Sequence, residues 1–123
     1  MKRLITISAF VAALTLSTGA EAASFNCGRW LCSHFGIAKC GSLALALQWA
    51  KKFPHTMAQP NAVVVQRRKG RALGGGPGGH VSKIVSLTSN PCRAIVVDNR
   101  GRYERDICKN RVALVAPSRA WTE

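Results

Sequence analysis

The stretch HVSKIVSL, residues 80–87, decides how this sequence is read, because apolar and polar side chains alternate along most of it. Such alternation is typical of a β-strand with one face on a core, and His80 is the first residue of the stretch. The segment AVVVQ, residues 62–66, precedes it and has the β-branched composition of a buried strand. Residues 94–107 follow as a hairpin and 112–115 as a last strand. Together these segments predict an antiparallel sheet.

Two helical segments precede the strands. The first covers residues 27–35, with Asn26 as its N-cap and Gly36 as its end. The second covers residues 43–53, rich in leucine and alanine, and Pro54 stops it. Helices that come first and an antiparallel sheet that follows are typical of an α+β protein. The sequence therefore predicts one domain in which N-terminal helices pack on a small antiparallel sheet.

A basic run and a glycine-rich run separate the first two predicted strands. Residues 67–71 read RRKGR and residues 74–79 read GGGPGG. The glycine content is that of a phosphate-binding loop, but the Lys-Ser/Thr ending that such a loop needs is absent. We therefore interpret this region as a mobile loop between strands.

The first 22 residues have the three parts of a secretory signal peptide. Lys2 and Arg3 are positively charged, residues 4–16 form an uncharged apolar run, and residues 20–22 read AEA, a small-x-small cleavage site. The apolar run is shorter than the roughly 20 residues that a membrane span needs. We expect cleavage after Ala22, a mature domain of residues 23–123 without a membrane span, and a secreted or periplasmic location.

Composition and charge narrow the class of protein. Hydrophobic residues make up 47% of the 123-residue chain, which excludes an intrinsically disordered protein. Loss of the signal segment removes Lys2, Arg3 and Glu21, and the formal net charge then changes from +13 to +12. A charge of this size favours encounters with polyanions. The chain has one tyrosine, which argues against a base-stacking surface and hence against nucleic acid as the partner.

Five cysteines allow at most two disulfides within the chain, so one thiol is left over. If residues 94–107 form a hairpin that turns near Arg100, opposite residues have numbers that sum to 200, and Cys92 and Cys108 satisfy this condition. Gly101 would supply the positive φ of the turn. Cys32 and Cys40 are then the second natural pair, and the pairing leaves Cys27 free.

The remaining thiol has several interpretations. Three alternatives are open for Cys27: it is a buried unpaired cysteine, it forms a disulfide with another molecule, or it is a reactive nucleophile. A metal site would need Cys27, Cys32, His34 and Cys40, whose spacings match no common zinc pattern. We therefore expect neither a metal nor another cofactor.

A catalytic set can be assembled around Cys27. It stands at a predicted helix start, where the helix dipole and free N–H groups lower the pKa of a thiol. His80 begins a strand and could take the thiol proton. Asp98 or Asn99, at the end of a neighbouring strand, could hold the imidazole in the required tautomer. The four residues predict nucleophilic catalysis by a cysteine.

The order of short motifs resembles the CHAP domain, the cysteine, histidine-dependent amidohydrolases/peptidases. The resemblance rests on residues Cys27-Gly28-Arg29-Trp30, Gly36, Ala46-Leu47-Gln48-Trp49, Ala62-Val63-Val64-Val65, Gly79-His80-Val81 and Asp98-Asn99. It covers nearly the whole of residues 23–123. The chain departs from the family in several respects. Members often carry Asn-Ala before the helix tryptophan, where this chain has Leu45-Ala46, and they usually have a short loop where this chain has the basic run 67–71. The family does not require the cysteines at 32, 40, 92 and 108, and the third site residue falls on either of two adjacent positions.

The resemblance implies a papain-like α+β fold and a hydrolase that acts on amide bonds of bacterial peptidoglycan. It implies that Cys27 is the nucleophile, that His80 is the base, and that Asp98 or Asn99 orients His80. Peptidoglycan or another anionic envelope polymer is then the expected partner. The alternative is a non-catalytic, disulfide-stapled cationic module that binds the anionic envelope. A reactive, unpaired thiol at Cys27 would favour the enzyme.

Overall fold

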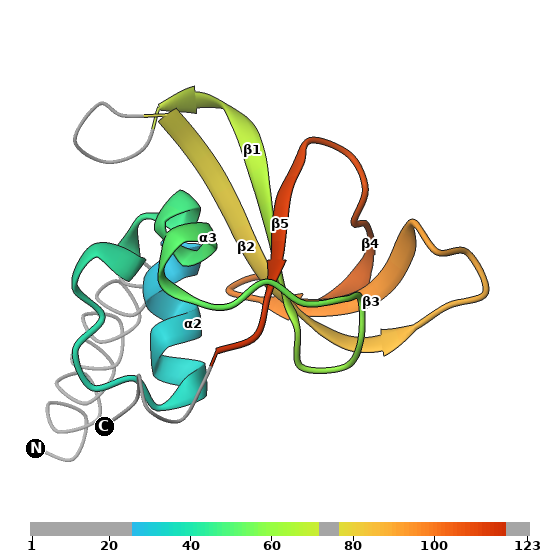
Figure 1. Ribbon diagram of the computed structural model, residues 1–123, viewed down its shortest axis with the longest axis horizontal. Helices are drawn as coiled ribbons and strands as arrows, with labels where there is room; N and C mark the ends of the chain where they lie inside the picture. The colour runs from blue at the N-terminus through green and yellow to red at the C-terminus, as the bar shows by residue number, and fades with distance from the viewer. Residues whose placement is uncertain (1–25, 72–76, 118–123) are drawn as a thin grey trace, which may run out of the picture.

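The structure, a computed structural model, describes residues 26–71 and 77–117. The predicted signal peptide, residues 1–22, and the glycines at 74–76 lie outside the described residues. Helical segments lie against one side of a twisted sheet (Figure 1). The fold is α+β with an antiparallel sheet, as the sequence predicts.

The sheet has five described strands in the order β4-β3-β2-β1-β5, and each neighbouring pair is antiparallel. The strands are β1 (Val63–Arg71), β2 (Pro77–Leu87), β3 (Arg93–Asp98), β4 (Gly101–Asp106) and β5 (Arg111–Val115). Only the last strand departs from a meander, because it returns to pair with β1 at the opposite edge from β4. The long strand β2 is therefore central, with β1 and β3 on its two sides.

Helix α2 (Cys27–Phe35) begins and ends as the sequence predicts. The Asn26 side chain accepts a hydrogen bond from the Arg29 N–H at 3.0 Å, which satisfies one of the free donors of the first turn. Gly36 ends the helix in the left-handed conformation, with φ of 73°. Among residues 26–71 and 77–117, no helix reaches the length and apolar character that a membrane span requires.

The prediction of one continuous helix over residues 43–53 is wrong. The segment forms two 3₁₀-helices, η1 (Gly41–Ala44) and η2 (Ala46–Gln48), and one short α-helix, α3 (Trp49–Lys52). Leu45 is extended between the two 3₁₀-helices. The buried Trp49 indole donates a hydrogen bond to the Leu43 carbonyl at 2.7 Å, so tertiary packing turns this carbonyl away from a regular helix.

The basic run 67–71 is strand rather than loop. It continues β1, and residues 77–79 of the glycine-rich run begin β2, where Arg67 pairs with Gly79 and Arg71 with Pro77. Charged side chains do not prevent this extension, because residues 67–71 are exposed. Backbone hydrogen bonds to the neighbouring strand are enough to keep this part of the chain extended. His80 is therefore the fourth residue of β2, not the first.

Both predicted disulfides are present. Cys32–Cys40 joins α2 to the segment before η1, and Cys92–Cys108 closes the β3–β4 hairpin. The predicted hairpin register is wrong by one residue, since Val97 pairs with Arg102 and the paired numbers sum to 199. The two-residue turn after Asp98 sets this register, with Gly101 at a φ of 108°. The disulfide lies just beyond the last ladder pair.

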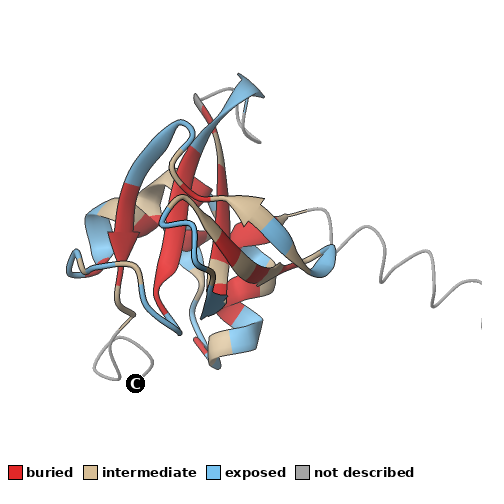
Figure 2. Ribbon diagram, turned by 90° about the vertical axis from the view of Figure 1, so that its right-hand side faces the viewer, coloured by how far each residue is buried: buried red, intermediate tan, exposed pale blue. Residues whose placement is uncertain are grey.

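Apolar side chains form a cluster on each face of the sheet. The helical layer covers one cluster, to which α2 contributes Leu31 and the sheet contributes Val65 and Val81. The other cluster contains Val64, Ala94 and Ile107. Figure 2 shows that buried residues run through the central strands, while exposed ones gather at the strand ends and loops. Both faces of the central strands are therefore covered.

Gly28 provides a test of how closely α2 approaches η1. A Cβ at this position would overlap the Leu43 carbonyl oxygen and lie 2.8 Å from the Ala44 carbonyl oxygen. Helix propensity alone predicts that Gly28→Ala stabilises the protein by about 1 kcal/mol. The overlap reverses the sign, and we expect a loss of about 3 kcal/mol in chemical denaturation. Ser33→Ala, an exposed change in the same helix, should alter the stability by less than about 0.5 kcal/mol.

Candidate active site

The structure brings Cys27, His80 and Asp98 together from three separate elements. Cys27 is the first residue of α2, His80 lies on the central strand β2, and Asp98 is the last residue of the neighbouring strand β3. All three are buried, with exposed fractions of 9%, 1% and 0%. Cys27 is also the free cysteine of the described chain. The arrangement therefore joins a free thiol, an imidazole and a carboxylate.

The imidazole of His80 uses one ring nitrogen for the carboxylate. Its Nε2–H donates a hydrogen bond to Oδ2 of Asp98 at 2.7 Å. Its other nitrogen, Nδ1, accepts a hydrogen bond from Nη2 of Arg68 at 3.1 Å. A guanidinium can only donate, so this contact fits the neutral imidazole with its proton on Nε2. Nδ1 is then the nitrogen that can take a proton.

Three hydrogen bonds hold the Asp98 carboxylate. Besides His80, the Tyr103 hydroxyl donates to Oδ2 at 2.6 Å and the Arg100 backbone N–H donates to Oδ1 at 2.8 Å. Burial raises the pKa of Asp98, but these hydrogen bonds outweigh it and lower the pKa to about 2. Asp98 is therefore ionised near neutral pH. Asn99, the other predicted candidate, is half-buried and follows in the turn.

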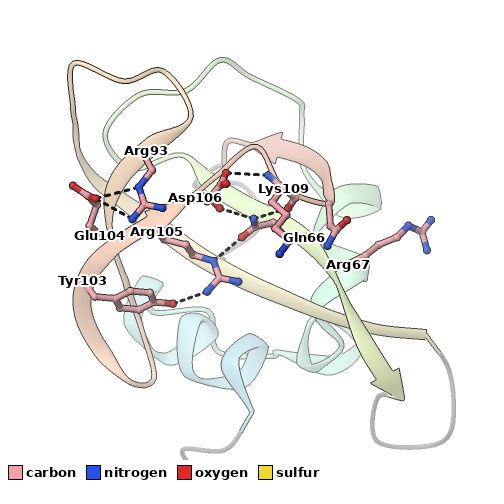
Figure 3. Close-up of a pocket in the computed structure, with 9 residues that line it drawn as sticks. Gln66, Arg67, Arg93, Tyr103, Glu104, Arg105, Asp106 and Lys109 are labelled. Atoms are coloured by element: carbon pink, nitrogen blue, oxygen red, sulfur yellow. Dashed lines mark hydrogen bonds and ion pairs between the residues drawn. The ribbon is translucent and has the colours of Figure 1, made fainter.

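Tyr103 is itself held in place by a wider polar network (Figure 3). Its hydroxyl accepts a hydrogen bond from Nη1 of Arg105 at 3.0 Å, and Nε of Arg105 donates to Oε1 of Gln66 at 2.7 Å. Gln66 is buried and donates to the carbonyl oxygens of Asp106 and Lys109. These residues line an open pocket of about 380 Å³. The network therefore fixes the tyrosine that supports the carboxylate.

The thiol of Cys27 is activated by its neighbours. Burial raises its pKa, but hydrogen bonds with the His80 side chain and the Val81 backbone lower it, as do the charges of His80 and Arg68. The net pKa lies below the ordinary value of 9.0. A position at the start of a helix favours the thiolate in the same direction. Cys27 is therefore more nucleophilic near neutral pH than an ordinary buried cysteine.

The pKa of His80 is shifted in the opposite direction. Burial lowers the pKa of His80, but hydrogen bonds with Asp98 and Cys27 raise it, and the net pKa lies above the ordinary 6.5. The charge of Arg105 acts against this rise. A lowered thiol pKa beside a raised imidazole pKa favours transfer of the thiol proton to His80.

Sequence reasoning missed Tyr103, Arg105 and Arg68. Tyr103 could have been found from the hairpin, because Val96 pairs with Tyr103 and alternation then places Tyr103 on the face of Asp98. Arg68 was hidden by the interpretation of residues 67–71 as a loop. Read as a strand paired with β2, the same run places Arg68 on the face of His80.

Neither a cluster of metal ligands nor a similar known protein adds to the description of the site. Within the described part of the chain, no three His, Cys, Asp or Glu side chains lie together so as to hold a metal ion. The expectation that no metal or cofactor is used stays a prediction. No family model, curated protein or solved structure matches this chain. The chemistry of the site must therefore be argued from its own geometry.

The network predicts how the reactivity of Cys27 depends on Asp98. Asp98→Asn removes the charge that favours protonated His80, so the thiolate of Cys27 becomes less favoured. The rate of Cys27 alkylation by iodoacetamide at pH 7 should then fall on the order of tenfold. Glu104→Gln removes one exposed carboxylate from the same hairpin and should leave the rate unchanged. An equal loss in both variants would show that overall charge, not the site, controls the thiol.

Proposed function

We propose that this protein is a secreted cysteine amidohydrolase or endopeptidase that cleaves amide bonds in bacterial peptidoglycan. The observation that carries the proposal is the buried contact of His80 with Asp98 beside the free, activated thiol of Cys27. This set is the arrangement by which cysteine hydrolases generate a nucleophile. The order of motifs that resembles CHAP domains, and hence a papain-like fold, supports the same class.

Each residue has a defined step in the reaction. The thiol proton of Cys27 passes to Nδ1 of His80, and the resulting thiolate attacks the amide carbonyl carbon and forms a C–S bond. His80 then donates this proton to the leaving nitrogen, the C–N bond breaks, and a thioester remains. Water, deprotonated by His80, hydrolyses the thioester and restores the thiol. Asp98 keeps the imidazole oriented and stabilises its charged form.

The start of α2 can stabilise the oxyanion. Helix geometry leaves the N–H groups of the first turn without an intrahelical acceptor, and the Asn26 side chain accepts the N–H of Arg29. The N–H groups of Cys27 and Gly28 are next to the reacting sulfur. Donors beside the nucleophile can stabilise the negative charge that develops on the carbonyl oxygen.

Charge and disulfides support the setting of the proposed reaction. The formal net charge of +12 expected after loss of the signal segment favours approach to the anionic polymers of a bacterial envelope. Two disulfides are typical of an oxidising compartment and are compatible with secretion. The alternative function, a cationic envelope-binding module without catalysis, is favoured by one observation, the 9% exposure of Cys27.

Digestion of purified peptidoglycan tests the proposal. Wild type should release fragments that mass spectrometry assigns to one class of amide bond, and Cys27→Ala should lower the rate by at least about a thousandfold. His80→Ala should lose a comparable factor, whereas His34→Ala, which changes an exposed histidine, should keep the wild-type rate.

Sedimentation separates the two functions. Folded wild type that binds the wall but releases no more fragments than Cys27→Ala would establish the binding module in place of the enzyme. Circular dichroism of each variant confirms that the compared proteins are folded.

A further inference from the structure

We infer that Arg68 is the binding site for a carboxylate of the substrate, and that this carboxylate frees His80 to accept the proton of Cys27. The inference rests on the proposed function, because it names the substrate class for the same site. Arg68 lies on β1, next to β2, and its side chain is exposed while its Nη2 reaches the buried imidazole. Arg68 is therefore in contact with both the solvent and the imidazole of His80.

Arg68 and the thiol compete for one lone pair. The Nε2–H of His80 donates a hydrogen bond to Asp98, so the proton of the neutral ring is on Nε2. Nδ1 then has a single lone pair in the ring plane. Nη2 of Arg68 lies 3.1 Å from Nδ1 and competes there with the hydrogen bond that Cys27 makes with His80. When Nδ1 takes the proton of Cys27 it becomes a donor, and two donors cannot face each other. Proton transfer thus requires Arg68 to leave the imidazole.

Arg68 has no strong acceptor to hold it in the part of the chain that the structure describes. The described carboxylates are engaged elsewhere: Asp98 with His80 and Tyr103, Glu104 with Arg93, and Asp106 with the backbone N–H groups of Cys108 and Lys109. The contact of Arg68 with His80 is to a neutral nitrogen. A carboxylate adds the attraction of opposite charges and often binds a guanidinium through two parallel hydrogen bonds, which a neutral ring nitrogen cannot offer.

A substrate carboxylate would therefore draw Arg68 away from Nδ1. The guanidinium would hold the substrate by this group, and the lone pair of Nδ1 would become available to the thiol at the same time. Binding and activation are coupled in this arrangement, because one side chain serves both. A substrate with a carboxamide in place of the carboxylate would bind less well and leave Arg68 on the imidazole.

Alkylation of Cys27 tests the inference without turnover. Iodoacetate carries a carboxylate where iodoacetamide carries a carboxamide. Each reagent forms a C–S bond with the thiolate as iodide leaves with the electron pair of the C–I bond. In wild type, we expect iodoacetate to react about tenfold faster than iodoacetamide, since Arg68 pairs with its carboxylate. Arg68→Gln should abolish this preference, and Arg68→Lys should retain part of it.

Arg67→Gln is the matched control. Arg67 is the preceding residue of the same strand, has the same charge and is also exposed, and it lines the pocket of Figure 3, whereas Arg68 contacts His80. This variant should keep the preference of wild type. If it loses the preference to the same extent as Arg68→Gln, general attraction by the basic surface explains the effect and the inference is wrong. Equal rates of the two reagents with wild type would also overturn it.

Peptide substrates distinguish failure of the inference from failure of the proposed function. Two wall peptides would be compared, identical except that a free carboxylate is replaced by a carboxamide. We expect kcat/KM in wild type to favour the carboxylate by about tenfold, and this ratio to approach one in Arg68→Gln. Cleavage of both peptides at the same rate overturns the inference alone. A carboxylate preference in alkylation without cleavage of either peptide overturns the proposed function alone.

Discussion

The hydrogen bond between Nε2 of His80 and Oδ2 of Asp98, 2.7 Å long and buried, is the interaction on which the rest of the site depends. A buried carboxylate without full hydrogen bonding would cost several kcal/mol. The Tyr103 hydroxyl and the Arg100 N–H donate the other hydrogen bonds to the Asp98 carboxylate, and Arg100 lies in the turn after β3. The β3–β4 hairpin therefore supplies hydrogen-bond donors to the Asp98 carboxylate as well as two strands to the sheet.

The same interaction determines which ring nitrogen of His80 is left for other contacts. Because Asp98 takes Nε2, only Nδ1 can exchange a proton with Cys27, and Arg68 now occupies it. The basic strand end 67–71 is thus more than a source of net charge. Arg68 contacts the His80 imidazole, and its neighbour Arg67 lines the pocket that also contains Tyr103 and Gln66. Alternation along one strand assigns the two arginines to different surroundings.

The position of Cys27 depends on a second constraint, the close approach of α2 to the segment that follows it. Gly28 lies against the carbonyl groups of Leu43 and Ala44, and the Cys32–Cys40 disulfide joins the same two segments. Neither contact involves the thiol of Cys27 or the imidazole of His80. Both keep the start of α2 over the sheet face from which Val81 meets the thiol.

Local signals in the sequence determined much of the fold. The cap at Asn26, the β-branched run 62–66 and the cysteine spacing predicted α2, the core strand and both disulfides, because caps, alternation and turns depend on neighbouring residues. Tertiary structure decided the rest. Residues 43–53 form short helical pieces around Trp49, which is buried in the core and donates to the Leu43 carbonyl, and strand pairing makes residues 67–71 part of β1. The contacts of His80 with Asp98 and Arg68 join distant residues, so only the folded sheet could establish which side chains share the site.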